Sequence, residues 1–243
     1  TVTNCKFRNN RRSTLGSALG NGGAVSVSSC AKAVLDNCRF EANSAPLSHF
    51  KAEYGGRFFG SAFYASATPV VMRYCRFTGN GAQQEYDADA GTVFLDGACG
   101  GSVVRNCAFV GNENLYGETS QRNPDEEAGA LVVKLSATTD IARVENCTFT
   151  RNLYAGKSGG CALNVVKGDV TVRNCIFYGN LCGPADAHHP ESIRVQTNSA
   201  ARVSYTLLDG PDACRADAGG TVERGEGCFA DDPLFASSFS AFG

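Results

Sequence analysis

The stretch Asn174-Cys175-Ile176-Phe177-Tyr178-Gly179-Asn180 decides the fold, because six versions of it recur along the 243-residue chain. In every version, phenylalanine follows cysteine by two residues and asparagine follows it by five. The cysteines of the six copies are Cys5, Cys38, Cys75, Cys107, Cys147 and Cys175. Recurrence at intervals of 28 to 40 residues indicates a repeat architecture, in which each repeat packs only against its neighbours.

Each repeat carries three short segments in which apolar side chains alternate with others. The first follows the order small, small, apolar, any, apolar, as in Gly23-Ala24-Val25-Ser26-Val27. The second has an apolar residue three positions before the motif cysteine, and the third contains the cysteine and the phenylalanine. Alternation with a period of two residues is typical of strands. Three short strands in each of about seven repeats predict an all-β solenoid, the single-stranded parallel β-helix.

Stacked repeats place equivalent residues in ladders along the coil. Cysteine and phenylalanine lie two residues apart on one strand, so we expect both to point inward. The residue before the cysteine is asparagine in five of the six copies. Asparagine tolerates left-handed backbone angles, which predicts a sharp bend between the second and third strands. We expect the asparagine five residues after the cysteine to close the third strand in the same manner, and the stacked amides to bond to one another.

The repeats resemble those of known β-helix proteins. The pairing of Gly22-Gly23-Ala24-Val25 with Phe-x-x-Asn resembles the repeats of the chlamydial polymorphic membrane proteins. The asparagine bends resemble those of pectate-lyase-like right-handed β-helices, and Asp231-Asp232-Pro233-Leu234-Phe235 resembles the closing segment of many secreted bacterial β-helix proteins. The resemblance implies a right-handed coil. It leaves function open, because this fold carries adhesins, lyases, hydrolases and structural tubes.

Length and composition bound the organisation of the chain. We expect a single β-helix domain over 1–243, with repeats in 1–210 and a closing segment in 211–243. A formal net charge of −2 argues against a nucleic-acid partner. The sequence contains no run of about 18 apolar residues, so we do not expect this segment to insert into a membrane. Thr1 already lies inside a repeat, so we expect a piece of a longer protein, with other domains or subunits covering the open ends of the coil.

The 12 cysteines divide into two groups. The six motif cysteines are predicted to be reduced and packed in the core, where cysteine behaves as a small apolar residue. Cys214 and Cys228 flank a glycine-rich loop and are the best candidates for a disulfide, while the pairing of the other four stays open. Use of so many cysteines favours an extracellular or cell-surface location.

Acidic residues in two long segments suggest a metal site. Each segment follows the end of a third strand, and the two leave neighbouring repeats. The acidic residues are Asp87, Asp89, Asp125, Glu126 and Glu127. Clustered carboxylate oxygens suit Ca²⁺, which makes calcium the one cofactor that the sequence suggests. The alternative is a plain solvated acidic edge.

Two rows of outward-facing residues are candidate binding surfaces. Lys6, Arg39 and Arg76 form a basic stripe on the third strands, which either is solvated surface or meets acidic glycans. Tyr64, Phe94 and Val132 are expected to form an exposed apolar strip on the first strands, a docking strip for a protein partner or a platform for sugar rings. The alternative is that a long loop folds back over this strip.

These observations favour a non-enzymatic extracellular β-helix that serves adhesion or structural assembly at a cell surface or in a filament. The alternative is a carbohydrate-active enzyme, a lyase or glycosidase acting on an acidic polysaccharide. Lyases of this fold use a Lys or Arg base and hydrolases use paired acids. No spacing in this sequence singles out such a pair, so no residue is assigned a catalytic role.

Overall fold

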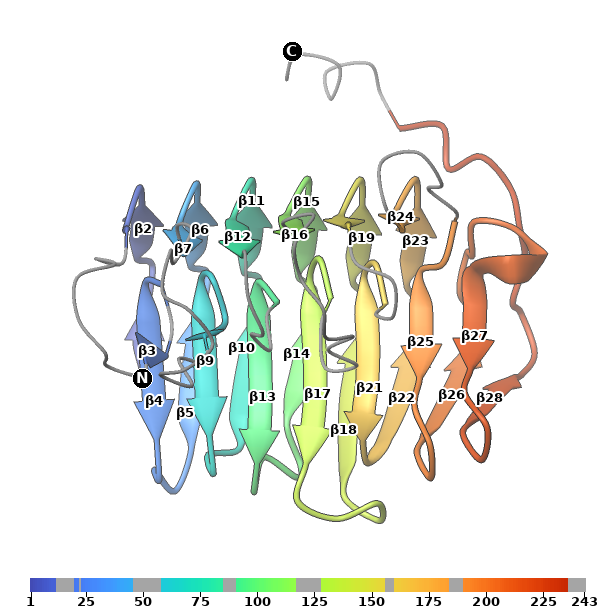
Figure 1. The fold of residues 1–243 in the computed structure, drawn as a ribbon, viewed down its shortest axis with the longest axis horizontal. Coiled ribbons are helices and arrows are strands. Elements are labelled where there is room, and N and C mark those ends of the chain that lie inside the picture. The colour runs from blue at the N-terminus through green and yellow to red at the C-terminus, as the bar shows by residue number, and fades with distance from the viewer. Residues whose placement is uncertain are drawn as a thin grey trace.

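Strands from successive repeats lie side by side along one long coil (Figure 1). The computed structural model describes residues 1–11, 20–21, 23–45, 58–84, 91–116, 128–155, 160–183 and 190–235. Neighbouring strands pair in parallel, as expected when the chain passes the same side of the coil once in each repeat. The predicted parallel β-helix is confirmed.

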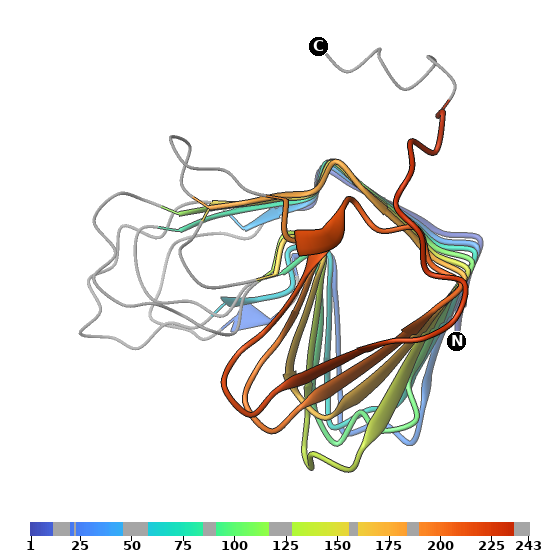
Figure 2. The same ribbon diagram turned by 90° about the vertical axis from the view of Figure 1, so that its right-hand side faces the viewer.

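Three large sheets surround the core, and a view along the coil shows their strands stacked one behind another (Figure 2). The first sheet contains β4 (Val25–Ser28), β9 (Phe63–Ser66), β13 (Val93–Gly97), β17 (Leu131–Leu135), β21 (Leu163–Lys167), β25 (Ile193–Val195) and β27 (Cys214–Ala216). The second contains β1 (Val2–Thr3), β5 (Ala33–Asp36), β10 (Val70–Arg73), β14 (Val103–Arg105), β18 (Ile141–Glu145), β22 (Asp169–Arg173), β26 (Ala200–Ser204) and β28 (Thr221–Arg224). The third contains β2 (Lys6–Arg8), β6 (Arg39–Glu41), β11 (Arg76–Thr78), β15 (Ala108–Val110), β19 (Thr148–Thr150) and β23 (Ile176–Tyr178).

A fourth sheet of short strands follows the third and was not predicted. It contains β7 (Ser44–Ala45), β12 (Gly81–Gln84), β16 (Glu113–Tyr116), β20 (Leu153–Tyr154) and β24 (Leu181–Cys182). Its sequences lack apolar alternation, so no periodicity marked them as strands. The backbone stays paired because the preceding repeat holds it in register, for example through the hydrogen bond from Glu113 N to Asn80 O at 2.9 Å. A full turn of the coil therefore uses four strands rather than three.

Two minor elements complete the described part of the chain. The strands β3 (Gly20–Asn21) and β8 (Phe58–Phe59) pair in a separate two-stranded sheet. A 3₁₀ helix, η2 (Pro211–Ala213), leads into β27 near the C-terminal end of the coil.

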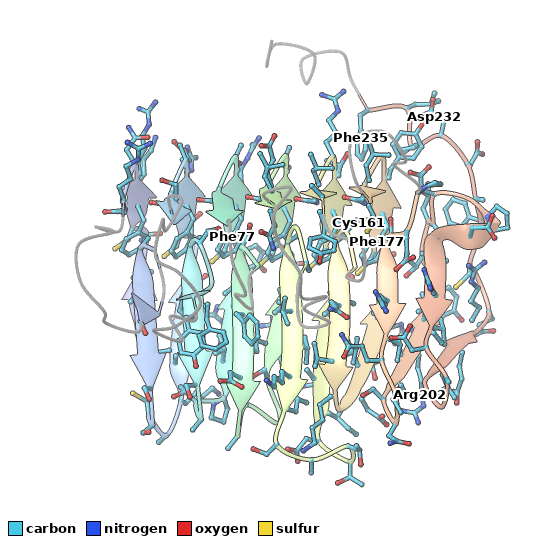
Figure 3. The ribbon with its side chains drawn as sticks, in the orientation of Figure 1. Phe77, Cys161, Phe177, Arg202, Asp232 and Phe235 are labelled. Atoms are coloured by element: carbon cyan, nitrogen blue, oxygen red, sulfur yellow. A yellow bond between two sulfur atoms is a disulfide. The ribbon has the colours of Figure 1, made fainter. Side chains whose placement is uncertain are left out.

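The core is built around the predicted phenylalanine ladder. The six rings stack along the coil with centroids 4.6 to 4.8 Å apart, close to the spacing of neighbouring strands. Phe77 and Phe177 mark two positions of this interior row in Figure 3. Phe40 and the four rings after it are fully buried, whereas Phe7, on the edge strand β2, is half-buried.

The cysteine ladder runs beside the rings as expected. All six motif cysteines are free thiols, and all but Cys5 are buried. Backbone N–H groups meet sulfur atoms of the next turn, for example Cys147 N to Cys175 Sγ at 3.4 Å. The hydrogen bond with Cys147 and burial raise the pKa of the Cys175 thiol well above its ordinary value. The buried Cys175 is therefore a packing residue whose thiolate form is disfavoured.

The bend between the second and third sheets is formed by one residue per turn, and we call this set the corner row. It contains Asn4, Asn37, Tyr74, Asn106, Asn146, Asn174 and Tyr205. All seven have φ between 49° and 55°, which confirms the predicted left-handed bend. Amides of neighbouring asparagines are hydrogen-bonded, as in Asn174 Nδ2 to Asn146 Oδ1 at 2.8 Å. The two tyrosines interrupt this chain of amides.

The asparagines that end the third strands form a second row, the inner amide ladder. It contains Asn10, Asn43, Asn80, Asn112, Asn152 and Asn180. The Nδ2 of each asparagine except the last, Asn180, donates to the Oδ1 of the next at 2.8 to 2.9 Å, which confirms the predicted amide stacking. The prediction that these asparagines have a left-handed backbone is wrong. The residue before each of them takes that conformation instead, as at Gly111 with φ 58°. This frees the asparagine side chain to turn inward.

Candidate functional site

The strip of Tyr64, Phe94 and Val132 is aligned as predicted, but it is not exposed. The three residues pair in register across β9, β13 and β17, and their exposed fractions are 3%, 0% and 0%. Phe59 of β8 packs on them, with ring centroids 5.1 Å from Tyr64 and 5.0 Å from Phe94. The prediction of an exposed docking strip is therefore wrong. Phe59 of β8 covers part of the apolar row, as expected because a contiguous apolar surface is seldom left in contact with water.

The basic stripe lies where the sequence placed it. Lys6, Arg39 and Arg76 pair in register across β2, β6 and β11 and are exposed. The charge of the stripe is partly balanced, because Lys6 Nζ lies 2.7 Å from Glu41 Oε2. Hydrogen bonding to Lys6 lowers the pKa of the Glu41 carboxyl. The stripe is a real surface feature, and its binding role stays a prediction.

The proposed calcium ligands Asp87, Asp89, Asp125, Glu126 and Glu127 lie outside the described residues. Within the part that the structure describes, no three His, Cys, Asp or Glu side chains come together in a group suited to a metal ion. Calcium binding therefore stays a prediction. Among the same described residues, no helix has the length and hydropathy needed to cross a membrane.

The disulfide joins Cys161 and Cys182, not Cys214 and Cys228. Cys161 lies just before β21 and Cys182 lies in β24, and their Cα atoms are 5.1 Å apart. Cys214 and Cys228 are free thiols that pack against the end of the core, so the predicted pair is wrong. The observed bond connects the first sheet to the fourth. Sequence spacing could not find it, because the fourth sheet itself left no pattern.

A buried charged cluster occupies the outer face of the first sheet near its C-terminal end. The outward row that contains Tyr64, Phe94 and Val132 continues in register through Asn164, Arg194 and Arg215. The side chain of Arg194 is 7% exposed, and its Nη2 lies 3.0 Å from both carboxylate oxygens of Asp217. A guanidinium group this deeply buried needs a carboxylate partner that neutralises its charge and accepts its hydrogen bonds.

Glu191 adds a second acid to this cluster. It is 4% exposed and its Oε2 lies 3.6 Å from Arg215 Nη1. Burial raises the pKa of the Glu191 carboxyl, and the neighbouring Arg215 and Arg194 charges partly oppose the shift. A shallow pocket of about 360 Å³ opens here, lined by Pro190, Glu191, Asp212, Cys214 and Arg215.

Chemically, this cluster can hold a proton on a carboxyl group beside two guanidinium groups. The sequence analysis singled out neither Glu191 nor Arg194. The available signal was an arginine in a row that carries Tyr64, Phe94 and Val132 in earlier turns.

The comparisons with known proteins agree with the fold. A protein-family model described as "Right handed beta helix region" matches residues 1–200. No curated protein and no solved structure matches the chain. The resemblance to the chlamydial repeats stays a prediction. Because the match covers most of the chain and the sheets of Figure 1 fit a coil of this kind, the chain belongs to the right-handed β-helix family.

Proposed function

We propose that this chain is a non-enzymatic extracellular scaffold that serves adhesion or structural assembly at a cell surface or in a filament. The observation that carries the proposal is the continuity of the internal ladders. Phenylalanine, cysteine and asparagine rows run through consecutive turns without a break. Because each turn is bonded to the next by both backbone and side chains, the coil is a stiff rod whose outer residues are free to vary.

Contacts on the outside support the same proposal. Ion pairs join neighbouring turns, as between Arg73 and Asp36 at 2.7 Å and between Arg202 and Asp169 at 2.9 Å. Arg202 lies on the outer surface near the C-terminal end in Figure 3. The Cys161–Cys182 disulfide suits an oxidising compartment. Neighbouring domains or subunits at the ends of the sheets, where β1, β2 and β4 lie on one side, would extend the rod.

A specific observation favours the second candidate, a carbohydrate-active enzyme acting on an acidic polysaccharide. The pocket beside Glu191 combines a carboxyl group of raised pKa with the guanidinium group of Arg215, and Arg194 lies close by. A buried acid with a perturbed pKa in a depression is a general acid or base candidate. An argument against the enzyme is that the buried Arg194–Asp217 ion pair also fits a purely structural role.

One experiment separates the two candidates. The purified chain is incubated with intact cells and with insoluble acidic polysaccharides, sedimented, and assayed for retention in the pellet. The same mixtures are assayed for new reducing ends and for unsaturated sugar products. We expect retention without product.

Product formation that falls at least tenfold in Glu191→Gln and Arg215→Gln would overturn the scaffold proposal in favour of the enzyme. Arg202→Gln is the matched control, since it removes an exposed arginine of an ion pair elsewhere on the coil. Absence of both retention and product would also count against the scaffold proposal.

A further inference from the structure

The two tyrosines of the corner row are conformational outliers. Tyr74 and Tyr205 have φ of 55° and 49°, in the left-handed region that asparagine tolerates and bulky residues avoid. Both are exposed, at 58% and 42%. With so much of each side chain in solvent, burial offsets little of the backbone strain, and such outliers collect at functional sites. A groove lies around Tyr205.

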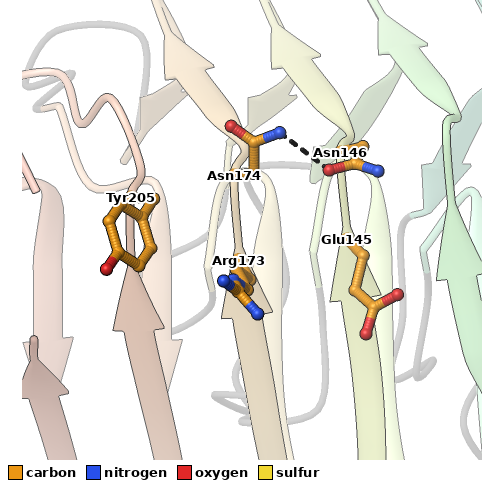
Figure 4. A pocket seen from close by; sticks show the side chains of 5 residues that line it. All are labelled: Glu145, Asn146, Arg173, Asn174 and Tyr205. Carbon is orange, nitrogen blue, oxygen red and sulfur yellow. Dashed lines mark hydrogen bonds between the residues drawn. The ribbon is translucent and has the colours of Figure 1, made fainter. Parts of the chain in front are cut away.

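That groove wraps around Tyr205 near the C-terminal end of the coil. On one side a hollow of about 460 Å³ is lined by Glu145, Asn146, Arg173, Asn174 and Tyr205 (Figure 4). On the other side a hollow of about 510 Å³ lies between the third sheet and the closing segment. It is lined by Asn146, Cys147, Thr148, Asn174, Cys175, Ile176, Tyr205, Leu207, Phe229, Asp231, Asp232 and Pro233. Asn146, Asn174 and Tyr205 line both hollows, so the two adjoin at these residues, and we call them together the corner groove.

The ring of Tyr205 is held in place from several sides. Its hydroxyl is hydrogen-bonded to the Glu226 carboxylate, and the Arg173 guanidinium carbon lies 5.4 Å from the ring centroid. Gly227 packs so closely that a Cβ there would lie 2.5 Å from Tyr205 Cδ1. The ring is therefore a fixed platform, and a ligand that stacks on it pays little ordering cost.

Hydrogen-bonding groups of both kinds surround this platform. Asn174 donates to Asn146, while its own Oδ1 accepts no hydrogen bond from any described residue, because Tyr205 takes the place of the next asparagine. Arg173 supplies N–H donors, and Glu145 and Asp232 supply acceptors at the rim. Phe229, 55% exposed, offers a second ring in the lining of the larger hollow.

The charge of the groove restricts the ligand. Glu145, Asp231 and Asp232 face a single cation, Arg173, so a polyanion is repelled. A ligand that suits the groove needs an apolar ring face for Tyr205 and hydroxyl groups that both donate and accept. A pyranose ring has both, and a neutral one avoids the charge penalty.

We propose that the corner groove around Tyr205 is a binding site for uncharged pyranose sugars of a glycan. The site lies at the bend between the second and third sheets, away from the Arg194 cluster on the first sheet. It goes beyond the scaffold proposal, because the groove binds sugar or fails to do so whether or not the rod takes part in adhesion.

The test uses the substitution Tyr205→Asn. Asparagine suits the left-handed bend and can donate to Asn174 Oδ1, so the variant extends the corner row and keeps its melting temperature while losing the platform. Binding is measured by saturation-transfer NMR and titration calorimetry with a panel of uncharged oligosaccharides of glucose, mannose, galactose and N-acetylglucosamine. We expect at least one to bind the wild type and to lose at least tenfold in affinity in Tyr205→Asn.

Tyr74→Asn is the matched control. It makes the same exchange at the other tyrosine of the corner row, outside the groove residues, and should leave sugar affinity within twofold of wild type. Equal affinity in Tyr205→Asn and wild type, or no binding by the whole panel, would overturn the proposal. So would preferential binding of polygalacturonate or of a lysine-rich peptide that depends on Tyr205, since it would assign the groove to another class of ligand.

Discussion

Two rows of asparagine run the length of the same coil and behave differently. In the inner amide ladder, every position from Asn10 to Asn180 is asparagine, and all but the first are fully buried. In the corner row, tyrosine replaces asparagine twice, and most positions face solvent. The backbone demand is stronger in the corner row, where the residue itself is left-handed. Burial of the amide, rather than backbone conformation, therefore makes asparagine obligatory.

The hydrogen bonds explain why the inner amide ladder admits no exchange. Asn112 Oδ1 accepts from both the backbone N and the Nδ2 of Asn80, and Asn112 Nδ2 donates to Asn152 Oδ1 and to Phe77 O. No other side chain of this size offers two donors and a two-fold acceptor in that geometry. In the corner row most amides face solvent, so water is available to replace a lost amide contact, and this leaves room for a functional side chain such as Tyr205.

The sharpest test of this difference is Asn112→Asp. The carboxylate keeps the size of the amide but puts an oxygen in the place of Nδ2, where two N–H groups donated to Asn152 Oδ1 and Phe77 O. We expect a loss of about 5 kcal/mol in unfolding free energy at pH 7, measured by urea denaturation. Burial raises the pKa of such a carboxyl in the folded state, so stability should be greatest at low pH and fall as pH rises through the folded value.

Asn146→Asp in the corner row is its control and should cost less than 1 kcal/mol, because the side chain is exposed and aspartate tolerates a left-handed backbone. Equal losses at the two sites would mean that burial does not distinguish the rows.

Removal of the amide by Asn112→Ala should cost about 3 kcal/mol. It removes the acceptor of the Asn80 backbone N–H and of one Asn80 Nδ2 proton, and it removes the donor to Phe77 O, all in a buried site. Asn152 Oδ1 loses one of its two donors and keeps the backbone N–H of residue 112. Differential scanning calorimetry should show a melting temperature lowered by several degrees with a cooperative transition. A change within 0.5 kcal/mol would show that water replaces the amide and that the ladder is not required for stability.

The corresponding change in the corner row, Asn146→Ala, should cost about 1 kcal/mol. Asn146 donates to Asn106 and accepts from Asn174, but these groups are exposed and regain bonds to water. Most of the loss comes from placing alanine at a left-handed position. A loss as large as that of Asn112→Ala in the same urea titration would remove the difference between the two rows.

The smallest effect has the opposite sign. Tyr74→Asn should raise the unfolding free energy by about 0.5–1 kcal/mol, because it relieves a left-handed tyrosine and restores amide contacts between Asn37 and Asn106. A destabilised variant would indicate that the Tyr74 ring packs usefully on its neighbours, and the corner row would then be less tolerant than its exposure suggests.

The outer face of the first sheet shows where sequence reasoning reaches its limit. The register of Tyr64, Phe94 and Val132 was predictable from period-two alternation, and the structure confirms it. Their burial was not, because it depends on Phe59, whose segment pairs with β3 far away in the sequence. The Cys161–Cys182 disulfide was missed for the same reason, since it joins two sheets of which one left no sequence pattern.

The sequence by itself determined the repeat, the parallel β-helix, the inward phenylalanine and cysteine ladders and the left-handed bend before each motif cysteine. These follow from local rules, because strand periodicity and the backbone tolerance of asparagine act within a few residues. Only the tertiary structure decided the fourth sheet, the cover over Tyr64, the burial of Arg194 with Asp217 and the groove around Tyr205. Each of these depends on segments from different turns meeting in space, which no spacing along the chain records.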